Sequence, residues 1–402
     1  MSSNVLSVCP ICESPHISVV WELPQFPFTE QFVDSHSLAN LEVNDQILLI
    51  CQYCTHVFLG KQYDPQRLYN SEYQTISSKS KAATDATQRL INFARQHIDF
   101  SKATLFFDIG ANDGSLLHQI REQGYSAQQV GLDPSFKDWD PRILGFTGFI
   151  ENFDFSNLPS SGSLRVIFAS HVLEHIANPK YFFQLLSDQM TTQDYLVLQF
   201  PAIEPIVHES RFDQIHHQHF HYFSWVSLLK ALENTELQVV ASGMDWDHYG
   251  AGNLILAKQS STFDGRSVTR SPWNQPDLMP YSNMNLSIVR DSIGIYTDYQ
   301  SAISRVLSST SYLALGAGLM SPIIFYHLKE SWSMCKGILD DDVSKQGRQY
   351  KGIPRLITPV PETLEGQTIL ISGSVSRQAG RALFNLASAR RARTILFPVL
   401  NA

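Results

Sequence analysis

The chain has 402 residues, of which 43% are hydrophobic and 17% charged, and a formal net charge of −8. This length exceeds what one hydrophobic core usually fills, so it excludes a single small domain and predicts two or three domains in a well-packed protein. The acidic balance argues against a nucleic-acid partner, and the absence of a leader pattern or a membrane-length apolar run argues against a membrane, so we expect a cytoplasmic protein.

Residues 1–75 are predicted to form a small metal-binding module. They hold four of the five cysteines in two Cys-x-x-Cys pairs, Cys9 with Cys12 and Cys51 with Cys54. Such pairs in a chain without an export signal are typical of metal ligands, because the cytosol keeps thiols reduced. Four thiolates suit a tetrahedral Zn²⁺ and leave no position for water, so we expect a structural zinc; the alternative is two incidental buried pairs.

Residues 76–260 are predicted to form an α/β domain with a parallel sheet. Apolar runs that predict strands alternate with helical patterns, which is typical of βαβ units. In chain order we expect helix 83–98, strand 104–107, helix 115–123, strands 129–132 and 166–169, helix 180–190 and strand 195–200.

A second α/β domain is expected in residues 283–402, beyond a polar stretch that contains prolines. It begins with a long helical pattern, and four strand-like runs follow. The expected elements are helix 284–307 and strands 312–315, 337–339, 368–371 and 394–397.

The first strand of the central region predicts a cofactor site. It ends at Asp108 and runs into the turn Gly110-Ala-Asn112-Asp-Gly114, whose small residues let a ligand approach the backbone at a helix N-terminus. The next strand ends at Asp133, about twenty residues further on, where a carboxylate can accept hydrogen bonds from both ribose hydroxyls. Asn112 breaks the dinucleotide-binding pattern, and an ordinary turn between strand and helix is the alternative.

Two further segments place polar side chains near this edge of the sheet. The strand 166–169 is followed by Ser170 and His171, at the carboxyl edge where open α/β sheets bind ligands. Residues 212–224 contain a cluster of histidines, for which three interpretations stay open. They are a second zinc site on the alternating His217, His219 and His221, a solvated polar segment, and a catalytic base or binding group; the position after the last predicted strand favours the third.

The runs 107–114, 131–134 and 170–179 resemble the first, second and fourth motifs of class I S-adenosylmethionine-dependent methyltransferases. The resemblance implies a Rossmann-like core in which the glycine turn lines the methionine part of the cofactor and Asp133 holds its ribose. Asn152 and Phe153 would flank the adenine. The cofactor-binding set in this core is Asp108, Gly110, Asn112, Gly114, Asp133, Asn152, Phe153, Ser170 and His171.

The cysteine module, this core and the second α/β domain together resemble the three-domain sugar C-methyltransferases, which act on nucleotide-linked keto-deoxysugars. The family pattern Phe-Asp-x-Ile-Tyr-His-Glu-His, followed by Tyr-Phe-Ser, implies that His219 is the base, with His217 and Tyr222 as further matching residues. This chain departs from the pattern by having His216 in place of Tyr and Gln218 in place of Glu.

Two tyrosines just before the core, Tyr69 and Tyr73, match family tyrosines near the cofactor, and the resemblance implies that they help to enclose it. The implied reaction is C-methylation beside a keto group, in which His219 removes the proton and His217 or His216 bonds the enolate oxygen. The alternatives are an O- or N-methyltransferase in which His219 deprotonates a hydroxyl, and a non-catalytic binding protein that retains the fold.

Overall fold

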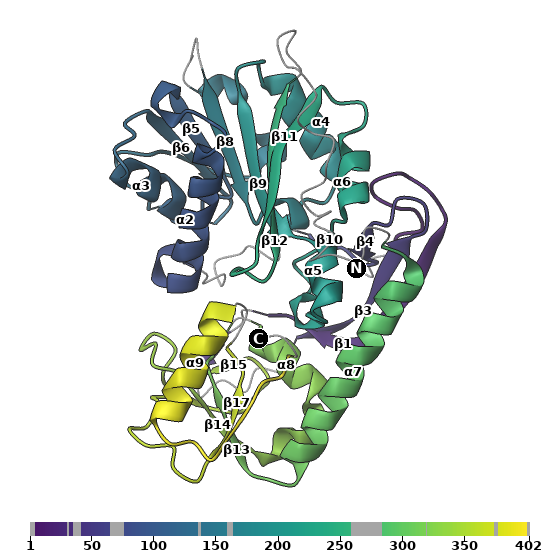
Figure 1. The fold of residues 1–402 in the computed structure, drawn as a ribbon, viewed down its shortest axis with the longest axis vertical. Helices are drawn as coiled ribbons and strands as arrows, with labels where there is room; N and C mark the ends of the chain where they lie inside the picture. Colours follow the sequence, from purple (N-terminus) through teal and green to yellow (C-terminus); the bar gives the residue numbers. More distant parts are fainter. Residues whose placement is uncertain are drawn as a thin grey trace.

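The computed structural model describes residues 5–29, 32–34, 42–64, 76–135, 138–158, 164–258, 284–318, 320–373 and 377–399. Within these ranges two α/β units lie one above the other in Figure 1, and a β-rich unit from the N-terminal region lies beside the junction between them. No helix in the described ranges is long and apolar enough to cross a membrane.

Seven strands of the described chain form the central sheet. In sheet order they are β11 (Leu237–Asp245), β12 (Ala251–Lys258), β9 (Tyr195–Pro201), β8 (Arg165–Ser170), β5 (Leu105–Ile109), β6 (Gln128–Asp133) and β7 (Leu144–Thr147). β12 is antiparallel to both of its neighbours, and the strands from β9 to β7 are parallel. The strand order reverses between β5 and β8, and at such a switch point the loops diverge and leave a crevice. The predicted Rossmann-like α/β fold is confirmed.

Alternate side chains of the central strands enter two different cores. Leu105 and Phe107 of β5 belong to one core and Phe106 to the other, which explains the unbroken apolar sequence of this strand. The helices that cover the sheet are α2 (Lys81–Arg95) and α3 (Ser115–Glu122) on one face and α4 (Pro179–Gln189) and α6 (Trp225–Leu232) on the other (Figure 1). The predicted helices and strands are therefore present, with ends shifted by up to a few residues.

The N-terminal sheet is completed by a strand from the central region. Its order is β1 (Ile17–Pro27), β3 (Val43–Cys51), β4 (Val57–Leu59) and β10 (His221–Tyr222). β10 pairs antiparallel with β4, and the amide of Leu59 donates to the carbonyl of Phe220 at 2.9 Å. The cysteine module and the histidine segment are therefore one structural unit, although about 160 residues separate β4 from β10 in the sequence.

The second α/β unit contains a parallel sheet of five described strands. In sheet order these are β16 (Ile357–Thr358), β14 (Cys335–Leu339), β13 (Tyr312–Leu315), β17 (Thr368–Ile371) and β18 (Thr394–Leu396). Its helices are α7 (Leu286–Ser308), α8 (Ser321–His327) and α9 (Arg377–Ala389). The long helix and the four strands predicted from the sequence are confirmed.

Several contacts join the units. Apolar residues of α7 and α8 share a core with β1, β3 and β4, and β2 (Phe32–Asp34) pairs with β15 (Arg348–Tyr350). The remaining short elements are α5 (Ile203–His208) and the 3-10 turns η1 (Ser77–Lys79), η2 (Phe100–Lys102), η3 (Ile150–Asn152), η4 (Phe155–Asn157), η5 (Leu173–His175), η6 (Phe212–Gln214) and η8 (Lys329–Met334).

Candidate active site

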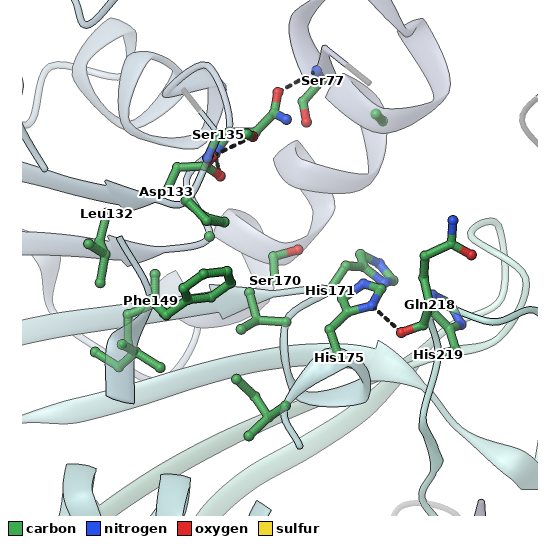
Figure 2. A pocket seen from close by; sticks show the side chains of 18 of the residues that line it. Ser77, Leu132, Asp133, Ser135, Phe149, Ser170, His171, His175, Gln218 and His219 are labelled. Carbon is green, nitrogen blue, oxygen red and sulfur yellow. Dashed lines mark hydrogen bonds between the residues drawn. The ribbon is translucent and has the colours of Figure 1, made fainter. Parts of the chain in front are cut away.

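A cavity of about 400 Å³ lies at the carboxyl edge of the central sheet, where β5, β6 and β8 end. This volume is within the range of small-molecule sites. Figure 2 shows Asp133 and Ser135 at one side of it and His171, His175 and His219 at the other, with Ser170 between them. The lining residues lie within the segments 76–83, 109–112, 132–135, 148–151, 170–176, 214–219 and 248–249, together with Met320.

At Gly110, in the turn after β5, the backbone faces the cavity with no side chain over it. Gly110 has a φ of +70°, and a Cβ at this position would lie 2.5 Å from Cγ2 of Val172. Only glycine adopts this conformation without strain and also avoids that contact. The structure therefore explains why a residue without a side chain stands here.

Asn112 and Asp133 lie together at the cavity wall. The amide of Asn112 donates to Oδ2 of Asp133 at 2.9 Å, and its side-chain oxygen accepts from the amide of Ser77 at 3.0 Å. Oδ1 of Asp133 accepts from the amide and the hydroxyl of Ser135, at 2.8 and 2.9 Å. These hydrogen bonds fix the Asp133 carboxylate at the end of β6 and hold the segment around Ser77 over the glycine turn.

Other predicted cofactor residues lie outside the cavity lining. Asp108 is buried beneath the turn, and burial together with the nearby carboxylates of Asp133 and Asp113 raises its pKa well above the usual range. Gly114 has a φ of +76° and begins α3, where a Cβ would lie 2.9 Å from Cδ1 of Ile143. Asp108 and Gly114 therefore pack on the side of the turn that faces away from the cavity.

The two residues predicted to flank the adenine, Asn152 and Phe153, lie outside the cavity lining. Asn152 is exposed, and the ring of Phe153 packs 5.3 Å from that of Phe107, so neither lines the cavity. Phe149 and Glu151 line it instead. Tyr69 and Tyr73 lie outside the described residues.

The histidine segment contributes His216 and His219 to the cavity wall. Their ring centroids are 3.9 Å apart, and the side chain of His219 is 13% exposed. Burial lowers the pKa of His216 to about 3, and burial plus the neighbouring His216, His175 and His171 holds the pKa of His219 well below its usual value. Both imidazoles are therefore neutral at pH 7 in the ligand-free site.

His217 and Tyr222, also predicted as catalytic, lie outside the cavity lining and brace the segment. Nε2 of His217 donates to the carbonyl of Phe26 at 3.0 Å, and its ring stacks on Phe28 with centroids 4.2 Å apart. The hydroxyl of Tyr222 accepts from the amide of His216 at 3.2 Å. The hydrogen bonds of His217 are to residues of the N-terminal module, which are far away in the sequence. The spacing of the histidines alone therefore could not predict that His217 faces away from the cavity.

Gln218 connects His216 to the N-terminal module. Its Oε1 accepts from Nδ1 of His216 at 2.9 Å and from the hydroxyl of Thr29 at 3.1 Å. The backbone carbonyl of Gln218 accepts from Nδ1 of His175 at 2.7 Å (Figure 2). Both the side chain and the backbone of this residue therefore position imidazoles at the site.

His171, predicted from the sequence to bind the cofactor, lines the cavity with Tyr249, and both belong to a polar network that includes the buried Glu174. Nδ1 of His171 lies 3.0 Å from Oε1 of Glu174, and the hydroxyl of Tyr249 lies 3.1 Å from Nδ1 and 3.2 Å from Nε2 of His171. Both His171 and Tyr249 have positive φ, at 55° and 45°, a backbone conformation that is uncommon for non-glycine residues. Glu174 lies within the run 170–179, whereas Tyr249 in the turn between β11 and β12 carried no sequence signal.

The four cysteine sulfurs form a compact cluster in which all pairs lie within 4.8 Å. Sγ of Cys9 is 3.6 Å from Sγ of Cys54, and Sγ of Cys12 is 3.5 Å from Sγ of Cys51. Tetrahedral zinc with bonds of about 2.3 Å requires sulfur separations of about 3.8 Å, so the cluster is compatible with Zn²⁺. The amide of Ile11 also points at Sγ of Cys9, at 3.4 Å, as expected where backbone N–H groups stabilise a thiolate.

Comparison with known proteins places this site in context. Residues 80–242 match the family model described as a methyltransferase domain. The chain is similar to the C-methyltransferase NovU of Streptomyces niveus, with 22% identity over 199 residues; the match covers 48% of this chain and 46% of NovU, less than half of that relative's length.

Two solved structures that are similar to this chain are methyltransferases. The plantazolicin methyltransferase BpumL, in complex with SAH, is 13% identical and covers 46% of this chain and 88% of its own, with a TM-score of 0.37. The magnesium protoporphyrin IX methyltransferase ChlM of Synechocystis PCC 6803 is 14% identical and covers 48% of this chain and 92% of its own, with a TM-score of 0.34. Residues 80–242 of this chain thus match a methyltransferase domain and have the Rossmann-like fold predicted from the sequence.

Proposed function

We propose that this chain binds S-adenosylmethionine at the carboxyl edge of the central sheet and methylates a carbon of a nucleotide-linked keto-deoxysugar. The observation that carries the proposal is that Gly110 and Asp133 line one side of the cavity and His219 lines the other. A cofactor-binding wall thus faces a neutral imidazole. Similarity to NovU, a C-methyltransferase, favours carbon as the methylated atom.

The residues that would hold the cofactor are Gly110, Asn112 and Asp133, with Phe149 and Glu151 at the adenine end. The fit rests on the bare backbone at Gly110 and on the fixed carboxylate of Asp133, which suits ribose hydroxyls. When bound, S-adenosylmethionine supplies an electrophilic methyl group on a sulfonium.

His219 would act as the base on the acceptor. The C–H bond beside the keto group breaks, its proton forms an N–H bond on the imidazole, and the electron pair spreads into an enolate that can accept the methyl group. His216 lines the same cavity, but its Nδ1–H donates to Oε1 of Gln218, so Nε2 of the neutral ring is an acceptor and does not donate to the enolate oxygen. His217, bonded to Phe26, would keep the segment in place.

We also propose that Cys9, Cys12, Cys51 and Cys54 hold a structural Zn²⁺. Four sulfur ligands leave no open position for water or substrate. The cluster lies next to β4, whose partner β10 begins two residues after His219. The metal would therefore act on the reaction only by stabilising the sheet that carries the histidine segment.

Calorimetric titration with S-adenosylhomocysteine tests the cofactor site. We expect micromolar binding by the wild type and no binding by Gly110→Arg, because the arginine would fill the space over the turn. Gly124→Arg is the matched control, since Gly124 also has a positive φ, of +91°, but no atom lies within 4 Å of its Cβ position. It should bind like the wild type. Absence of binding by the wild type would contradict the proposal.

The acceptor is tested with nucleotide-linked keto-sugars in deuterated water. The wild type should exchange the proton beside the keto group, and with S-adenosylmethionine it should form a product with a new carbon–methyl bond, detected by NMR. Methylation at oxygen or nitrogen would contradict C-methylation but leave the cofactor assignment intact.

A further inference from the structure

Glu174 is a fully buried carboxylate at the histidine side of the cavity, with a side-chain exposure of 0%. Its Oε1 lies 3.0 Å from Nδ1 of His171 and 3.8 Å from Nε2 of His219. Its Oε2 has no hydrogen-bond partner, and no lysine or arginine forms an ion pair with it, among the residues that the structure describes. Burial of a carboxylate without a cation has a large free-energy cost, so a positive charge near Glu174 would be stabilising.

The backbone holds Glu174 and His219 in a fixed relation. The amide of Phe220, next to His219, donates to the carbonyl of Glu174 at 2.8 Å. Nδ1 of His175 donates to the carbonyl of Gln218 at 2.7 Å. These two hydrogen bonds join η5 to the histidine segment on either side of His219, so the 3.8 Å separation is set by the fold and not by two free side chains.

Among the residues that the structure describes, Glu174 is the titratable group beside His219 whose charge favours a positive charge on the imidazole. The groups that face it are Glu174 and His175 from η5, His171 after β8, His216 from its own segment and Tyr222 from β10. Burial and the three imidazoles disfavour protonation of His219, which lowers its pKa. An imidazole held in this way would be a weak base for a carbon acid unless a carboxylate stabilised its protonated form.

We propose that Glu174 is a positioning residue for His219: its carboxylate stabilises the imidazolium that forms when His219 accepts a proton from the acceptor. This inference rests on the proposed function. Gln218, adjacent to His219 in the chain, is neutral and is occupied by His216 and Thr29. The negative charge at this site therefore comes from a different element of the fold.

The network beyond Glu174 fixes the carboxylate. Tyr249 and His171 form a hydrogen-bonded chain that ends on Oε1, so His171 can donate Nδ1–H to the carboxylate while its Nε2 accepts from the phenol. In the step itself the acceptor's C–H bond breaks and an N–H bond forms on His219. In this role the contribution of the Glu174 carboxylate is electrostatic.

NMR titration of the full zinc-bound chain labelled with ¹⁵N-histidine tests this proposal without knowledge of the acceptor. His219→Asn identifies the His219 signal among the 14 histidines. We expect the pKa of His219 to fall by about 1 or more in Glu174→Gln, because an opposite charge within about 4–6 Å has that effect. Glu204→Gln is the matched control, a buried glutamate outside the cavity lining whose carboxyl accepts from the amide of Trp225, and it should leave the pKa of His219 unchanged.

Three outcomes would overturn the proposal. One is an equal His219 pKa in the wild type and Glu174→Gln, and another is a wild-type His219 that does not titrate above about pH 4. The third is a loss of the His175 and His219 titrations on adding Mn²⁺ to the wild type but not to Glu174→Gln. That result would assign the cluster to a metal ion, since ligand atoms of Glu174, His175 and His219 lie within 4.8 Å of one another.

The pH profile of turnover separates positioning from structural damage. Turnover should rise with pH as His219 loses its proton; in Glu174→Gln this rise should move to lower pH, and the plateau should be lower because the base is weaker. A lower plateau with an unmoved rise would indicate structural damage and overturn the proposal. If the proposed function fails, the wild type shows no turnover at any pH, while the NMR result still decides the role of Glu174.

Discussion

Replacement of His219 by asparagine is expected to lower methyl transfer by about 10²- to 10⁴-fold, the usual contribution of a positioned general base. Affinity for S-adenosylhomocysteine should stay at the wild-type value, because His219 lies across the cavity from Asp133 (Figure 2). The measurements are turnover with an accepted keto-sugar and calorimetric titration of the same preparation.

His118→Asn is the control for this substitution. His118 lies on α3 with a side chain 33% exposed, outside the cavity lining, so its replacement should change neither turnover nor affinity. Unchanged turnover in His219→Asn would refute the role of His219 as base. Loss of cofactor affinity together with turnover would instead indicate that the histidine segment supports the whole cavity.

Removal of the metal from the cysteine cluster is expected to unfold the sheet β1-β3-β4-β10 and to release residues 216–222. Binding of a structural zinc is worth about 10–16 kcal/mol at pH 7, which is comparable to the entire stability of a domain, about 5–15 kcal/mol. Hydrogen exchange measured by mass spectrometry should then increase in β4 and β10. β5 should stay protected, because it is buried in the middle of the central sheet.

Two serine variants provide the comparison. Cys51→Ser should reproduce the effect of a chelator, with less than one zinc per chain and a lower melting temperature. Cys335→Ser, at a buried cysteine of β14 far from the cluster in the sequence, should keep its zinc and the protection of β10. Equal exchange in β10 with and without metal would contradict a structural role for zinc.

The local elements of both sheets could be predicted from the sequence because their patterns are local. The run 105–107 is apolar at every position, as expected for a strand buried on both faces, and α2 begins directly after Ser80, whose side chain caps it. The turn at Gly110 and the carboxylate at Asp133 could be located for the same reason. Each follows its own strand, and parallel strands bring their carboxyl ends to one edge.

The residues that line the cavity near Phe149 and the contacts around Glu174 could not be predicted in this way. Phe149 and Phe153 are both aromatic and four residues apart, and only the packing of Phe153 against Phe107 decides which of them faces the cavity. Tyr249 reaches the cavity because β11 and β12 pair as a hairpin at the sheet edge. No periodicity in its neighbourhood indicates that contact.

In the histidine segment, residues 212–224, the contribution of the sequence can be separated from that of the tertiary structure. Its sequence alone determined that imidazoles would gather near the last predicted strand, since composition and spacing are properties of the chain itself. Which imidazole faces the cavity was decided by tertiary structure: His217 bonds to Phe26 of β1, Gln218 bonds to Thr29, and β10 pairs with β4. These partners lie more than 150 residues away in the chain, and only the closed fold brings their hydrogen-bonding groups within reach.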